Sequence, residues 1–362
     1  MRYIKLHENE KVPVFKNVIY ALRLVCKADK RLLISYLISY IFDDVFVRYI
    51  QSILFLKVLL SLFDRGAEFR EYVRDLLLFF AIAAATKIVS WVAAYIRQVA
   101  TKNVLKVLNN MVFQKAISLD VGCYESPEFY DKYQRATLIM SAGYFDIICY
   151  DVALVVSGIV SLVLVIGTVT AISPVYLLFL LPIALVFVIE IYKSKAVYKR
   201  DLEMTGNNRT KAYIQRTVFL KDFSKDMRTS NIFSVMMKRF EKAVDGNIKI
   251  LKSYGVKLFL YSIVSSLFSE FIPIIGTYAY AGYKFVKGGS MTVSGFSVVV
   301  SSISTVREAT LDIAEAFDEM TQMALYFQNL KDFFDFEPSI KDGNIQAGEF
   351  ESLEFRNVTF RY

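Results

Sequence analysis

The chain has 362 residues, of which 55% are hydrophobic, and it carries a formal net charge of +8. A soluble protein of this length cannot easily hide that much apolar surface, so the composition disfavours a soluble enzyme and favours a lipid bilayer as solvent. One histidine and three cysteines, without metal-ligand or disulfide-scaffold spacing, argue against a zinc site, a haem site or a disulfide-rich fold.

The first 31 residues predict a cytosolic N-terminus that contains an amphipathic elbow helix. Within Val14–Cys26, apolar residues recur at helical spacing on one side, while lysine and arginine lie elsewhere. Such a helix is typical of one that lies along a membrane surface. The alternative is a soluble helix packed on a cytosolic domain.

Residues 32–336 predict six transmembrane helices, because six apolar stretches are each near the length that crosses a bilayer. We expect an all-α membrane protein with six long helices that extend into the cytosol. The predicted spans are Leu32–Phe63, Leu76–Tyr95, Val152–Ile172, Val175–Ile191, Leu258–Phe285 and Thr292–Val306.

The distribution of lysine and arginine predicts the orientation of these spans. Basic residues collect before the first span, in the two long inner loops and after the sixth span, whereas the outer loops hold few. The positive-inside rule then places both termini in the cytoplasm. We expect an integral membrane protein, assigned to a bacterial plasma membrane, with membrane lipids as partners and no nucleic acid.

The inner segments predict helices that outrun the bilayer. From Leu76 to Ser118 there is no proline or glycine, and the apolar periodicity continues throughout. One helix of that length would be about twice as long as the hydrocarbon is thick. Two short connecting helices are expected between such rods, near residues 126–133 and 221–231. We predict that these short helices, called coupling helices below, expose contact residues, namely Pro127, Phe129, Tyr130 and Tyr133 in the first and Phe223 and Met227 in the second. The alternative is a plain helix-turn-helix connection.

The end of the chain changes character. Residues 337–349 are rich in turn formers and predict a linker, and residues 350–362 alternate in the manner of a β-strand. Because a strand needs partners, we expect this short β fragment to begin a second domain.

Ionisable residues inside the predicted spans suggest a substrate cavity, because charges in a membrane are costly. Asp44 and Arg48 have the spacing of a helical ion pair, which is alternatively a purely structural pair. Glu270 precedes Pro273 in the fifth span and has uncharged neighbours in the sequence. The sixth span continues into an acidic stripe, which is alternatively only solvated at the interface. The residues assigned to the cavity are Asp44, Arg48, Glu270, Glu308 and Asp312.

Several segments, taken in order, resemble the membrane half of ATP-binding cassette (ABC) exporters of the six-helix, domain-swapped type. The last eight residues, Phe355–Tyr362, are similar to the first strand of that family's nucleotide-binding domain. The other segments that carry the resemblance lie at Leu119–Asp131, Lys225–Arg228, Met237–Phe240 and Gly288–Gly295.

The resemblance implies a transport pathway that works by alternating access, in a homodimer or a heterodimer. The acidic residues assigned to the cavity favour cationic or amphipathic molecules, such as a basic peptide, as its cargo. The resemblance also implies that Tyr362 stacks on adenine, and that ATP and Mg²⁺ are bound by a nucleotide-binding domain that this chain lacks. No glycine loop here ends in Gly-Lys-Ser/Thr, so we expect no nucleotide hydrolysis by these residues alone. The alternatives are a six-span carrier driven by an ion gradient and a membrane channel or scaffold.

Overall fold

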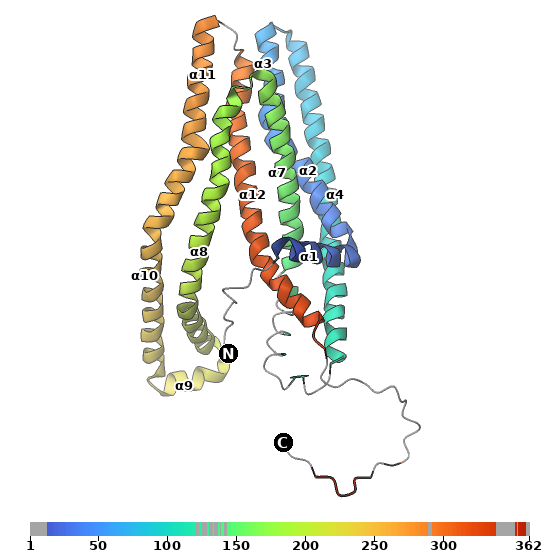
Figure 1. Ribbon diagram of the computed structural model, residues 1–362, viewed down its shortest axis with the longest axis vertical. Helices are drawn as coiled ribbons and strands as arrows, with labels where there is room; N and C mark the ends of the chain where they lie inside the picture. Colours follow the sequence, from blue (N-terminus) through green and yellow to red (C-terminus); the bar gives the residue numbers. More distant parts are fainter. Residues whose placement is uncertain are drawn as a thin grey trace.

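The computed structural model describes residues 13–119, 123, 124, 129, 133, 137, 139, 140, 143–288, 292–337, 352 and 354–359. Long helices run side by side, and one shorter helix, α1, lies across them, while α4, α8 and α10 continue past it (Figure 1). All regular structure in the described ranges is helical, which confirms the all-α prediction. The elements in chain order are α1 (Val14–Asp29), α2 (Arg31–Val45), η1 (Phe46–Phe55), α3 (Leu56–Arg65), α4 (Phe69–Ile117), α7 (Tyr144–Ile172), α8 (Tyr176–Phe219), η2 (Lys221–Phe223), α9 (Ser224–Thr229), α10 (Ile232–Ser266), η3 (Leu267–Phe271), α11 (Ile272–Gly288) and α12 (Val293–Phe334).

Five helical stretches in the described part of the chain are long and apolar enough to cross a membrane, which indicates an integral membrane protein. Two of them are composite: α2, η1 and α3 form one stretch, and α10, η3 and α11 form another. In both composites the middle piece is a π-helix. The five stretches are Arg31–Arg65, Phe69–Ile117, Tyr144–Ile172, Tyr176–Phe219 and Ile232–Lys287.

The sixth predicted span forms the first part of α12, a helix of 42 residues that does not reach the same apolar content. Its place in the bundle accounts for this composition. Val298, Ser302 and Ala309 have no exposed surface, since α12 packs against α7, α8 and α3. A helix that is surrounded by protein does not need an apolar side chain at every position. Its assignment as a membrane span stays a prediction.

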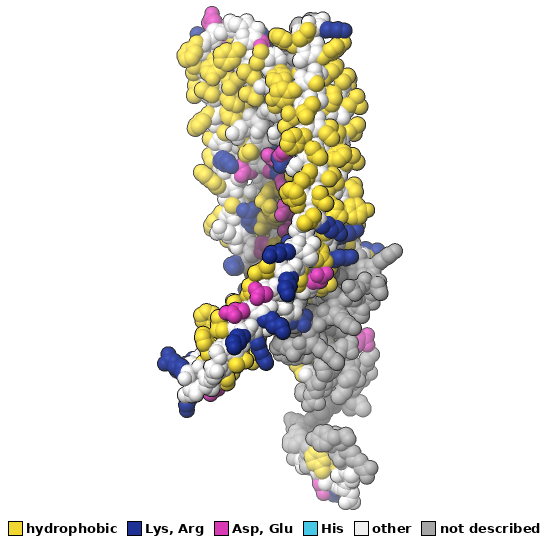
Figure 2. All heavy atoms as spheres, turned by 90° about the vertical axis from the view of Figure 1, so that its left-hand side faces the viewer, with side chains coloured by type: hydrophobic (Ala, Val, Ile, Leu, Met, Phe, Trp, Pro, Cys, Tyr) yellow, Lys and Arg dark blue, Asp and Glu magenta, His cyan; other side chains and the backbone are white. Residues whose placement is uncertain are grey.

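The outer surface of the bundle is apolar in the way that lipid requires. Large side chains such as Phe80 and Trp91 on α4 are 71% and 70% exposed. Figure 2 shows hydrophobic side chains covering the upper part of one face, with charged side chains gathered toward the lower end. In water such a surface would aggregate, so these side chains face hydrocarbon.

The elbow helix is confirmed as an amphipathic helix, but its apolar residues divide between two surroundings. Val18 and Val25 are buried against the bundle, whereas Phe15 and Ile19 are 69% and 47% exposed. A buried hydrogen bond holds α1 against α12: Asn17 Nδ2 donates to the carbonyl oxygen of Ala324 on α12 at 2.9 Å. The helix therefore belongs to the bundle and still presents apolar side chains outward.

The predicted strand near the end of the chain is wrong for the residues that the structure describes there. Residues 352 and 354–359 contain no strand, and Asn357 has a φ angle of +51°. An isolated segment has no neighbouring strand to accept and donate its backbone hydrogen bonds, so the alternating pattern alone cannot form a sheet.

Close packing between α7 and α12 depends on a small residue. A Cβ atom added at Gly158 would lie 3.0 Å from Cγ1 and 3.1 Å from Cδ1 of Ile313. The neighbouring Ser157 and Ser161 are fully buried as well. Small side chains at this position let the two helices approach closely, which is how helices associate inside a membrane.

We predict that Gly158→Leu destabilises the protein by about 1–3 kcal/mol, because the larger side chain overpacks the contact with Ile313. Gly167→Leu is the matched control on the same helix, since a Cβ atom there has nothing within 4 Å. Thermal unfolding in detergent should show a lower transition temperature for the first variant only. Equal transition temperatures for the two variants would contradict close α7–α12 packing.

Candidate functional site

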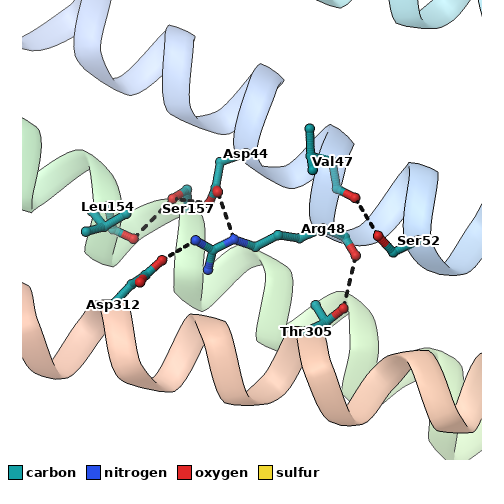
Figure 3. A network of polar contacts seen from close by, with 8 residues as sticks. All are labelled: Asp44, Val47, Arg48, Ser52, Leu154, Ser157, Thr305 and Asp312. Carbon is teal, nitrogen blue, oxygen red and sulfur yellow. Dashed lines mark hydrogen bonds and ion pairs between the residues drawn. The ribbon is translucent and has the colours of Figure 1, made fainter.

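Four helices meet around the side chain of Arg48, which lies in the π-helical segment η1. Its Nε atom is 2.8 Å from Oδ1 of Asp44, and its Nη2 atom is paired with Oδ2 of Asp312 on α12. Asp44 also accepts a hydrogen bond of 2.9 Å from the hydroxyl of Ser157 on α7. Figure 3 shows the guanidinium between α7 and α12. The predicted Asp44–Arg48 pair is therefore confirmed, and it is joined to two further helices.

This network is shielded from solvent. The side chains of Arg48, Asp44 and Asp312 are 11%, 16% and 28% exposed. One guanidinium between two carboxylates leaves a net charge of −1 where the surroundings are poorly polarisable. Such an arrangement is strongly destabilised when one member is removed, because the others remain buried without a partner.

The π-helical segment itself contributes backbone acceptors to the site. A π-helix widens the turn and changes which carbonyl groups are paired within the helix. The carbonyl oxygen of Arg48 accepts a hydrogen bond from Thr305 Oγ1 on α12 at 3.1 Å, and that of Val47 accepts one from Ser52 Oγ at 2.9 Å (Figure 3). The first of these contacts is a second tie between η1 and α12.

Glu270 has a partner that sequence reasoning missed. It lies in the other π-helical segment, η3, and its Oε1 atom is 2.7 Å from Nη1 of Arg307 on α12. The neighbours of Glu270 in the sequence are uncharged, and its charged partner, Arg307, comes from a distant part of the sequence. Both side chains are about one-third exposed, so the pair borders open space.

Each π-helical segment thus presents one charged residue to the same helix, α12. The two arginines keep unused hydrogen-bonding capacity, since Nη1 of Arg48 and Nε of Arg307 are buried and have no hydrogen-bond partner in the described part of the chain. Glu308 follows Arg307 directly and is exposed. The site can therefore offer both acidic oxygens and guanidinium donors to a polar ligand.

Aromatic side chains between α2, α4 and α7 extend this polar region, and the sequence analysis did not single them out. The rings of Tyr40 and Tyr150 are 5.2 Å apart and edge to face, and Tyr36 contacts both. The guanidinium of Arg97 lies over the Tyr36 ring at 4.6 Å. Tyrosine faces attract cations and apolar groups, so this cluster suits an amphipathic ligand.

The predicted contact residues of the first coupling helix face the protein where they are described. Phe129 is fully buried, with its ring 5.3 Å from that of Phe336, and Tyr133 lies 5.7 Å from Phe333. Our expectation that Phe129 projects outward was wrong, because the aromatic end of α12 supplies an apolar partner. Pro127 and Tyr130 lie outside the described residues, as does Tyr362.

A short helical connection does follow α8, where the second coupling helix was predicted. It consists of η2 and α9 and joins α8 to α10 (Figure 1). Phe223 is 41% exposed there, and Met227 is half-buried. Any role of these two residues in coupling stays a prediction.

Comparison with known proteins leaves the family open. No protein-family model matches the chain, and no curated protein matches it. The structure therefore supports a helical membrane protein with an internal charged site, and the site's chemistry is the basis for a functional assignment.

We predict that Arg48→Met lowers the free energy of unfolding by about 3–5 kcal/mol, because Asp44 and Asp312 lose their cation. Adding Asp44→Asn and Asp312→Asn should restore much of this loss by removing the unpaired charges. Lys87→Met is the control, since the Lys87–Asp43 pair is 46% and 38% exposed and should matter less. Thermal unfolding of the purified variants measures all three effects, and equal losses in Arg48→Met and Lys87→Met would contradict the network's importance.

Proposed function

We propose that this chain is the membrane-spanning half of an ATP-driven exporter and forms its substrate pathway by alternating access. The observation that carries the proposal is the combination of an internal charged site with helices that are much longer than a bilayer is thick. Helices of this kind can transmit movement from a soluble partner to a site inside the membrane.

The lengths of the helices support this transmission. With 49 and 44 residues, α4 and α8 are about 74 Å and 66 Å long at 1.5 Å per residue. The hydrocarbon core of a bilayer is only about 30 Å thick. The long helix that we predicted from Leu76 to Ser118 lies within one continuous helix, α4, as expected from its lack of proline and glycine. Pro182 lies inside α8, and the helix continues through it.

Side-chain hydrogen bonds join α8 and α10 into one rigid pair of helices. Three hydrogen bonds join them along their length: Asn247 to Asn208 at 2.8 Å, Tyr254 to Glu203 at 2.6 Å, and Ser265 of α10 to Glu190 of α8 at 2.9 Å. The two helices are connected at their ends by η2 and α9. A force applied at α9 would therefore move both helices together.

The site favours cationic or amphipathic cargo, including basic peptides. The site contains more negative than positive charges. It holds two guanidiniums, those of Arg48 and Arg307, and four carboxylates, those of Asp44, Glu270, Glu308 and Asp312. Tyr36, Tyr40 and Tyr150 add aromatic surface on the adjoining helices. A negative net charge beside aromatic rings attracts organic cations both by charge and by cation–π contact.

The energy source is proposed to be a nucleotide-binding domain outside this sequence. The sequence has no phosphate-binding glycine loop, so we assign no hydrolytic step to these residues. The similarity of Phe355–Tyr362 to the first strand of such a domain supports this proposal, as does the order of the other resembling segments. A second transmembrane subunit, identical or different, would complete the cavity.

The gene tests this proposal directly. We expect its reading frame to continue past the codon for Tyr362 and to encode a phosphate-binding loop, and we expect the longer protein to hydrolyse ATP. In that protein Tyr362→Ala should weaken ATP affinity severalfold through the loss of ring stacking, as measured by nucleotide titration. A stop codon at that point would instead favour a gradient-driven carrier or a scaffold, and unchanged affinity would remove Tyr362 from the nucleotide site.

Glu270→Gln tests the cargo site. The change keeps the shape of the side chain and removes the charge that pairs with Arg307, so we expect transport of cationic cargo into vesicles to fall severalfold. Glu241→Gln is the control, because Glu241 is exposed on the distant part of α10, in the same composite helix. A cargo profile that is the same in both variants would exclude Glu270 from the site.

A further inference from the structure

The side chain of Asp151 on α7 is the most completely buried carboxylate in the described part of the chain. The residue is only 1% exposed, and neither carboxylate oxygen has a hydrogen-bond partner among the residues that the structure describes. An ionised carboxylate in such surroundings would lose its hydration and gain nothing in return. The residue belongs to none of the ion pairs described above.

The register between α7 and α12 places this side chain opposite two more acids. The two helices run antiparallel: the rings of Phe145 and Phe327 are 5.2 Å apart, and Gly158 lies against Ile313. Asp151 is about halfway between Phe145 and Gly158, so it faces the part of α12 near residue 320. This register brings Glu319 and Glu315 toward Asp151, so their negative charges act on its carboxyl group.

No cation from the described residues of the other helices pairs with Asp151. From α2, Asp44 points to Arg48 and Ser157 farther along the bundle, and Tyr40 contacts Tyr150. From α1, the amide of Asn17 is committed to α12. From α8, Glu190 is paired with Lys193. Among the described residues, the charged side chains that act on Asp151 are those of Glu319 and Glu315, and both are acidic.

We propose that Asp151 and Glu319 form a proton-binding site that holds one shared proton at neutral pH. Two carboxylates can only accept hydrogen bonds, so they cannot bond to each other until one carries a proton. With that proton in place, one carboxyl donates to the other, and the pair of buried Asp151 and half-buried Glu319 has a single negative charge. Like-charged carboxylates in one buried site retain a proton in this way.

The proton would control the contact between α7 and α12. When it is bound, the pair joins the two helices with a short, charge-assisted hydrogen bond. When it leaves, two negative charges face each other in poorly polarisable surroundings and push the helices apart. Glu315 is exposed, so it gives the proton a route from open space to the pair. This inference does not rest on the proposed export function.

Infrared difference spectroscopy of the whole chain in lipid nanodiscs tests the site. The carbonyl stretch of a protonated carboxylic acid should be present at neutral pH and disappear as the pH rises. Asp151→Asn should lack this band. Glu319→Gln should move its loss to lower pH by about one unit or more, because the amide can donate to an ionised Asp151.

Asp318→Asn is the control, because Asp318 lies next to Glu319 on α12 and accepts a hydrogen bond from Gln322 at 3.0 Å. That variant should keep the band and its titration. The proposal is overturned if the wild type lacks the band at neutral pH, or if Asp151→Asn retains it. It is also overturned if sodium, compared with N-methylglucamine at constant pH, removes the band, because the site would then bind a metal cation.

Thermal unfolding gives an independent measurement if the spectra of a variant are disturbed by misfolding. The folded protein binds one more proton here than the unfolded chain does at neutral pH, so stability should fall as pH rises through the titration of the pair. Asp151→Asn cannot release this proton, and its stability should lack that decline. A decline of equal size in wild type and Asp151→Asn would refute the site.

Discussion

Pairing of charges inside an apolar bundle is the constraint on which this structure depends. Arg48 cannot be buried among membrane helices unless acids surround it, and those acids come from α2 and α12. The Glu270–Arg307 pair ties a second composite helix to α12 in the same manner. Separating any of these helices would leave a charge without a partner, so the network restricts which movements of the bundle are possible.

The two π-helical segments explain how these charges reach α12. A π-helix is rare, and its turns within α-helices are frequently found at functional sites. Here η1 holds Arg48 and η3 holds Glu270, each in the middle of a long composite helix. The bundle therefore has two irregular turns at the places where its internal ion pairs form. Such turns can change their hydrogen bonding at lower cost than a regular helix can.

Much of the fold could be predicted from local pattern, and most of the site could not. The amphipathic pattern of Val14–Cys26 and the uninterrupted run in Leu76–Ser118 each lead to the observed helix, because period and breakers act locally. The Asp44–Arg48 pair followed from its spacing. Two contacts could not be predicted, because they join segments that are distant in the sequence. They are the pairing of Glu270 with Arg307 and the packing of Phe336 on Phe129. The alternating pattern at residues 350–362 was misleading, since a strand also needs a neighbour.

The attachment of α1 to α12 has a consequence for the way lipids act on the protein. The amphipathic pattern of α1 predicts that this helix rests in the headgroup layer of a bilayer, and the helix lies across the bundle with Phe15 and Ile19 exposed (Figure 1). The Asn17 amide fixes the depth of α12 relative to that layer. A thicker or thinner bilayer shifts its headgroups along the spans, and α12 would be carried with α1. Membrane thickness would then bear on the one helix where the internal charges are collected.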